Sequence, residues 1–130
     1  MGYRYCEMPK GINIDSLLSW GISVCRENGL KVSNHISYSK KACNRKDFYA
    51  ITERGQHNRF EITFSVTAWK CLSIHDLAPW RALILHELCH TIRGCFNHGK
   101  KWKEAIYKLN KLGYNINPKP YSMKQTDSYP

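Results

Sequence analysis

Three histidines and one glutamate lie close together in residues 84–102, which read ILHELCHTIRGCFNHGKKW. His86 and His90 are four residues apart, so on an α-helix they differ by about 40° around the axis and stack one turn apart. Two imidazoles placed in this way can bind one zinc ion, each at ~2.0–2.1 Å. The pair therefore requires a helix over these residues.

Two further residues turn the histidine pair into a candidate catalytic site. Glu87 is offset from the metal axis, so its carboxylate can reach a zinc-bound water, accept a proton and pass it to a leaving group. Catalytic zinc has three protein ligands and one open position. His98 follows His90 after the segment TIRGCFN, whose glycine allows the chain to turn back. We expect His86, His90 and His98 to bind the metal and Glu87 to act as general base.

The first half of the chain predicts one helix followed by three strands. Residues 13–29 carry apolar side chains at helical spacing, with Asp15 as the expected N-cap and Gly29 as the stop. Residues 30–39 alternate apolar and polar side chains. Residues 43–66 hold two more such runs, separated by the turn ERGQHN.

The second half predicts two helices. Apolar residues recur every three or four positions from Asp76, and Gly94 is the expected end of this helix. A second helix is expected from about His98 to Gly113, with the preceding Asn97 as its cap. Residues 117–130 are polar and proline-rich, so we expect a loop and a frayed tail.

The composition favours a folded protein with a basic surface. The chain has 130 residues, 20 Lys and Arg against 10 Asp and Glu, and a formal net charge of +10. This excess favours polyanionic partners, nucleic acid above all, and is equally consistent with a solvated surface. No apolar run approaches the ~20 residues of a membrane span. The six cysteines form no C-x-x-C pair and no secretory signal is evident, which predicts reduced, mostly buried thiols in a cytoplasmic protein, nucleoid-associated if bacterial.

The chain resembles the SprT-like (Spartan/SprT) metallopeptidase domain over about residues 12–116. The shared pattern is HExxH, a variable connector, then His-Gly, two residues and an aromatic residue. In this sequence these residues are His86, Glu87, His90, His98, Gly99 and Trp102. Members of the family often carry a cysteine zinc ribbon, which this sequence lacks, so any contact with DNA must use the basic surface.

The resemblance implies a compact, zincin-like α+β domain over residues 1–130. We expect an N-terminal helix, a small three-stranded sheet of antiparallel type, the HExxH helix and a C-terminal helix. One Zn²⁺ per chain would be held by His86, His90 and His98, with Glu87 as the catalytic residue. The expected partner is a protein or peptide substrate, with DNA as a further candidate partner through the basic surface. No membrane contact is expected, and the expected state is a monomer.

Other roles and other classes stay open. Tyr107, His75 and Arg93 are candidates for stabilising the oxyanion, Thr91 and Asn97 are candidates for orienting ligands, and Trp102 is expected to pack behind His98. The alternative function is a zinc-stabilised nucleic-acid-binding or interaction module without protease activity. A third class is an interaction protein that binds no metal.

Overall fold

The computed structural model describes residues 5–7, 11–39, 41–73 and 75–117. The fold is α+β, as expected, with four helices and one three-stranded sheet in the described part. The helices are α1 (Ile14–Glu27), α2 (Val66–Cys71), α3 (Ala78–Cys89) and α4 (Lys100–Asn110). The strands are β1 (Tyr5–Glu7), β2 (His35–Tyr38), β3 (Lys41–Cys43), β4 (Ala50–Arg54) and β5 (Arg59–Phe64). The short elements β1, β3 and α2 were not predicted.

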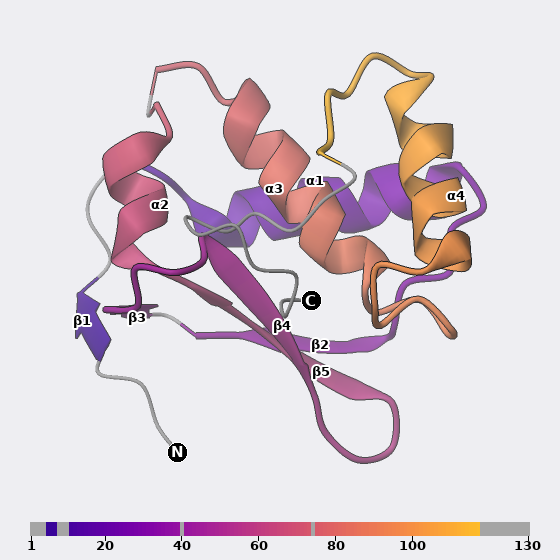
Figure 1. Ribbon diagram of the computed structural model, residues 1–130, viewed down its shortest axis with the longest axis horizontal. Helices are drawn as coiled ribbons and strands as arrows, with labels where there is room; N and C mark the ends of the chain where they lie inside the picture. Colours follow the sequence, from indigo (N-terminus) through magenta and orange to yellow (C-terminus); the bar gives the residue numbers. More distant parts are fainter. Residues whose placement is uncertain (1–4, 8–10, 40, 74, 118–130) are drawn as a thin grey trace.

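The three-stranded sheet has the order β2-β5-β4, and α1 and α3 lie over one of its faces (Figure 1). β4 and β5 are antiparallel and are joined by the predicted turn, in which His57 and Asn58 adopt left-handed φ angles of 57° and 60°. Such angles at both central residues are typical of tight hairpin turns. β2 runs parallel to β5, so the prediction of an antiparallel-type sheet is wrong for this strand. The physical reason lies in the order of the strands, because β5 lies between β2 and β4. The chain passes from β2 at one edge of the sheet to β4 at the opposite edge before the hairpin leads it back to β5.

α3 forms the centre of the molecule. The predicted helix after Asp76 is confirmed, and it is buried on every side from Ala82 to Cys89. A helix that is apolar all round belongs in a core. α1 packs closely on α3 at Gly21, where an added Cβ would lie 2.6 Å from Leu88 Cδ1 and 2.8 Å from Ile84 Cγ2. The core therefore fixes the position of the helix that carries the HExxH motif.

Three predicted helix ends differ from the structure. α1 is capped by Asn13 and not by Asp15, because the Asn13 side chain accepts a hydrogen bond from the Ser16 N–H at 3.1 Å. α3 ends at Cys89, well before Gly94. The N-cap of α4 is Gly99, whereas Asn97 Oδ1 accepts from the Gly99 N–H at 3.0 Å in the turn before that helix. Both side-chain cap predictions are thus wrong, while the helices themselves are confirmed.

Two simpler expectations concern membranes and cysteines. None of the described helices has both the length and the apolar composition required to span a membrane. The cysteines whose side chains the structure describes are free thiols, and all of these except Cys71 are buried. This agrees with the prediction of reduced, mostly buried thiols.

Candidate metal centre

The three predicted ligands converge on one point. His98 Nε2 lies 3.3 Å from His86 Nε2 and 3.2 Å from His90 Nε2, and the ligand atoms of all three residues lie within 4.8 Å of one another. Tetrahedral geometry with metal–nitrogen bonds of ~2.0–2.1 Å places ligand nitrogens ~3.3–3.4 Å apart. The three residues can therefore bind one metal ion without rearrangement of the chain.

Backbone carbonyls orient two of the imidazoles. His86 Nδ1 lies 3.3 Å from the Asn117 carbonyl oxygen, and His90 Nδ1 lies 3.0 Å from the Cys95 carbonyl oxygen. Each Nδ1–H can donate to its carbonyl, which leaves the Nε2 lone pair directed at the common point. Lone pairs that face one another repel, and a cation between them removes that repulsion. Imidazole ligands of this kind suit Zn, Cu, Fe and Ni.

Burial keeps His90 in the form that binds a metal. His86 and His90 are fully buried and His98 is half-buried. Burial and, to a smaller extent, the charge of His98 lower the pKa of His90 to about 3, while the hydrogen bond to the Cys95 carbonyl opposes this change. Metal ligation requires the neutral imidazole, so the His90 side chain needs no deprotonation at neutral pH before it can bind.

Trp102 forms the wall behind the histidines. Its ring is stacked on His90, with centroids 5.1 Å apart and an interplanar angle of 9°. It contacts His86 and His98 edge-on, with centroid distances of 4.7 and 4.6 Å. The prediction that Trp102 packs behind His98 is confirmed, and the same ring contacts all three imidazoles. Trp102 thus closes one side of the centre to water.

Glu87 lies beside the histidines. Its side chain is fully buried, and its Oε1 accepts a hydrogen bond of 2.7 Å from the hydroxyl of Thr52 on β4. Its Oε2 has no hydrogen-bond partner and lies 3.7 Å from His86 Nε2. Burial raises the pKa of Glu87 to about 8, and the hydrogen bond from Thr52 opposes this rise. A buried carboxylate oxygen without a partner marks a position where a polar ligand is expected.

The return of the chain to His98 depends on the segment after α3. His90 is the C-cap of α3, and Gly94, with a φ of +82°, allows the chain to reverse. Cys95 is buried and presents its carbonyl to His90. These turns bring His98 back to His90 at the end of the helix, just before α4 begins.

Several predicted supporting residues lie elsewhere. The Thr91 hydroxyl accepts from the Ser33 N–H at 3.1 Å and donates to the Leu88 carbonyl at 2.8 Å, so its described bonds tie two segments together and orient no ligand. Tyr107 is exposed on α4, with 56% of its surface accessible. His75 precedes α3, at the opposite end of that helix from His90.

The residues that do support the centre include three that the sequence did not indicate. They are Thr52, which holds Glu87, and Cys95 and Asn117, whose carbonyls hold the histidines. Asn117 was predicted to begin the polar tail, but its carbonyl belongs to the centre. Residues 118–130 of the predicted tail lie outside the described residues.

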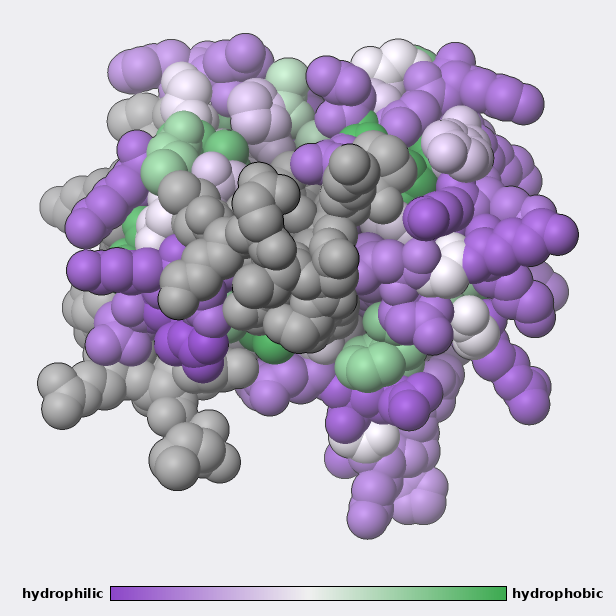
Figure 2. All heavy atoms as spheres, viewed as in Figure 1, coloured by the Kyte–Doolittle hydropathy of each residue, from purple (hydrophilic) through white to green (hydrophobic). Residues whose placement is uncertain are grey.

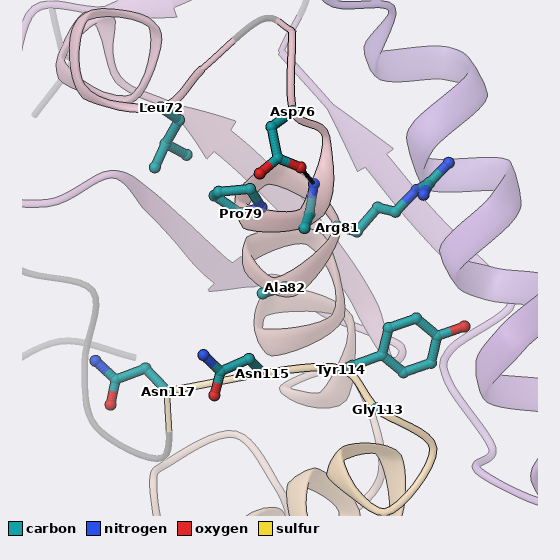
Figure 3. Close-up of a pocket in the computed structure, with 10 residues that line it drawn as sticks. Leu72, Asp76, Pro79, Arg81, Ala82, Gly113, Tyr114, Asn115 and Asn117 are labelled. Carbon is teal, nitrogen blue, oxygen red and sulfur yellow. Dashed lines mark hydrogen bonds between the residues drawn. The ribbon is translucent and has the colours of Figure 1, made fainter.

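A cavity of about 420 Å³ lies along the first part of α3. Figure 3 shows Pro79 and Ala82 of α3 on one side and Tyr114, Asn115 and Asn117 on the other. Ala82 is one helical turn before His86. Asn117 lines this cavity, and its carbonyl also accepts the His86 hydrogen bond.

Comparisons with known proteins do not assign the chain to a family. No family model matches the chain, and neither a curated protein nor a solved structure does. The chemistry of the site therefore rests on three histidines able to bind one metal ion, with a buried carboxylate beside them.

Proposed function

We propose that the chain is a zinc-dependent metallopeptidase that resembles the SprT-like domain, with one Zn²⁺ held by His86, His90 and His98. One observation supports this best: Oε2 of Glu87 lies without a hydrogen-bond partner beside the converging Nε2 atoms. Structural zinc sites are closed by four protein ligands and need no such carboxylate. Three ligands with an adjacent acid are typical of hydrolytic centres.

In the proposed reaction, Glu87 moves the protons. Zinc, when bound, lowers the pKa of water and polarises the carbonyl of the peptide bond. Glu87 accepts a proton from the attacking water through Oε2 and delivers it to the nitrogen of the leaving amine as the C–N bond breaks. The Thr52 hydroxyl holds Oε1, so the other oxygen stays directed at the centre during both transfers.

The neighbouring strand offers a place for the substrate. β4 lies at one end of the sheet order, so one of its edges has no strand partner among the described residues. An extended peptide can pair with such an edge through backbone hydrogen bonds. Because Thr52 belongs to β4 and contacts Glu87, a peptide bound there would run beside the general base.

The basic surface supports DNA-associated proteins as substrates. The chain carries a formal net charge of +10, and hydrophilic side chains project from much of the surface in Figure 2. On α4 the exposed side chains include Lys100, Lys101, Lys103 and Lys108. Such a surface attracts polyanions over distances comparable to the Debye length, about 8 Å at physiological salt.

The test combines metal analysis with proteolysis. Protein purified without a histidine tag would be assayed for zinc per chain and for cleavage of casein, with and without single-stranded DNA. We expect one zinc per chain in both the unsubstituted protein and Glu87→Gln, and loss of cleavage only in the variant. Equal cleavage by the two proteins would remove Glu87 from the mechanism.

The second candidate is a zinc-stabilised nucleic-acid-binding or interaction module without protease activity. The excess of basic residues favours it, as does the complete burial of His86, Glu87 and His90. This candidate predicts DNA binding that requires the metal and is unchanged in Glu87→Gln. It also predicts no cleavage of casein by the unsubstituted protein under any condition.

A further inference from the structure

A second, smaller cavity lies at the opposite end of α3 from the one in Figure 3. It has a volume of about 270 Å³ and lies between β4, β5 and the loop that leads to His98. We call it the arginine pocket. Its lining includes Arg54, Phe60, Ile92, Arg93, Phe96 and Asn97. Its walls combine apolar side chains with two guanidinium groups.

The residues that line the arginine pocket are close in sequence to residues of the metal centre. Arg54 follows Thr52 by two residues on β4, so the two side chains point to the same face, ~7 Å apart. Asn97 immediately precedes the ligand His98, and Phe96 follows Cys95, whose carbonyl holds His90. The pocket therefore lies on the side of the metal centre that β4 and the segment before His98 form.

The electrostatics of the pocket favour an anion. The Arg54 guanidinium lies 4.7 Å from the centroid of the Phe96 ring. Arg93 is exposed and makes no ion pair among the described residues. The Lys101 ammonium lies close to Gly94, which also lines the cavity, since a Cβ placed on Gly94 would lie 3.5 Å from Lys101 Nζ. No acidic side chain lines the described cavity to neutralise these charges.

We propose that the arginine pocket binds a carboxylate of the substrate, so that the protein selects acidic peptides; this inference rests on the proposed peptidase function. Arg93 and Arg54 supply planar donors that match a carboxylate. Ile92, Phe60 and Phe96 pack against the methylene groups that carry it. The carboxylate comes from an Asp or Glu side chain or from the end of the peptide.

The dimensions of the pocket favour a peptide over a nucleic acid. A volume of about 270 Å³ suits one side chain and not a strand of nucleotides. Base stacking needs an open aromatic face. Here Arg54 lies over Phe96, and Phe60 is buried. These contacts leave little aromatic surface for a base.

Binding is measured by fluorescence anisotropy in the Glu87→Gln background, so that peptide is not cut. Three labelled peptides of one sequence carry a central Glu, Gln or Lys, and each is made with a free and an amidated C-terminus. We expect the Glu peptide to bind about tenfold more tightly than the Gln peptide, as one charge-assisted contact implies. If only the free C-terminus raises the affinity, the carboxylate is the terminal one.

Variants of the pocket locate the effect. Arg93→Ala and Arg54→Ala are expected to remove the preference for Glu, and Arg93→Glu is expected to transfer it to the Lys peptide. Lys70→Ala, which removes one exposed charge on α2 at the other side of the molecule, is expected to keep it (Figure 1). Circular dichroism of each variant confirms that it is folded.

Two results of this binding assay would overturn the inference. One is equal binding of all peptides whatever their charge or terminus. The other is an Arg93→Ala variant that loses affinity for a single-stranded oligonucleotide while its peptide preference is unchanged. Because the assay uses an inactive variant, absence of proteolysis in the unsubstituted protein would contradict the proposed function and leave this test valid. Proteolysis without any acidic preference would contradict the inference alone.

Discussion

Replacing Thr52 with Val tests how the general base is held. The Thr52 hydroxyl donates a 2.7 Å hydrogen bond to Glu87 Oε1 and lies 3.3 Å from the Glu87 carbonyl oxygen. Both residues are fully buried. Valine keeps the branched shape of threonine and removes only the hydroxyl, so Glu87 would be left with no hydrogen bond to either carboxylate oxygen.

The magnitude follows from the charge on the carboxylate. A hydrogen bond to a charged group contributes about 1.5–3 kcal/mol, and one between neutral groups about 1 kcal/mol. The pKa of Glu87 is about 8 in the metal-free protein, because burial raises it and the Thr52 bond lowers it in part. Thr52→Val should therefore raise this pKa further. The loss of stability should be about 1 kcal/mol below pH 8, where the carboxyl is protonated, and about 2 kcal/mol above it.

The assay is urea denaturation of the metal-free protein at pH 6 and pH 9 in a reducing buffer. A second measurement follows peptide cleavage by the zinc-loaded protein. If the bond aligns Glu87 during proton transfer, a loss of about 2 kcal/mol in the transition state lowers kcat roughly 30-fold. KM should change little, since the Thr52 side chain is fully buried and valine leaves the backbone of β4 unchanged.

Thr63→Val is the matched control. Thr63 lies on the neighbouring strand β5 and is equally buried, but its hydroxyl has no hydrogen-bond partner. Removing that hydroxyl should leave kcat unchanged and leave the stability unchanged or higher. If Thr52→Val behaved like Thr63→Val at both pH values and in kcat, Thr52 would not hold the base.

Four further expectations concern the metal, the base and the core. Chelation with EDTA should lower the melting temperature, and added Zn²⁺ should restore it. Zinc at 100 times its Kd stabilises the folded protein by about 2.7 kcal/mol. An unchanged melting temperature would contradict the proposed zinc site. His98→Ala should weaken zinc binding in calorimetric titration while circular dichroism stays the same, because a ligand is lost and the helices are not. Glu87→Gln should stabilise the metal-free protein above about pH 5. The unfolded carboxyl ionises near its ordinary pKa of 4.5 while the folded one holds its proton to about 8, so the unsubstituted protein loses stability over that range and the variant does not. Gly21→Ala should cost about 1–3 kcal/mol in urea denaturation, because its Cβ would meet Leu88 at 2.6 Å; no loss would mean that α1 can shift.

Features that depend on the spacing of residues within one element were predictable from the sequence. The helix that carries His86 and His90 follows from apolar periodicity and from the four-residue separation of the two histidines. The hairpin between β4 and β5 follows from its turn residues. Strand direction is different, because alternation of apolar side chains is identical in parallel and antiparallel pairs. The parallel pairing of β2 with β5 was therefore not accessible from the sequence.

The cap of α1 shows how burial decides between two local signals. Asn13 and Asp15 are both favourable N-cap residues, and the sequence pattern alone does not separate them. A start after Asn13 places Ile14 in the helix with only 4% of its surface exposed. The apolar contact thus moves the helix start by two residues.

Support for the metal centre was least predictable because much of it comes from the backbone. The carbonyls of Cys95 and Asn117 orient His90 and His86. Every residue type has a backbone carbonyl, so the identity of these two residues gives no signal in the sequence. Motifs record side chains, so such contacts leave no trace in them. Thr52 does contribute a side chain, but it lies on β4, 35 positions from Glu87 along the chain. The motif therefore identifies the ligands and the base, while the fold determines whether the imidazoles and the carboxylate face one another.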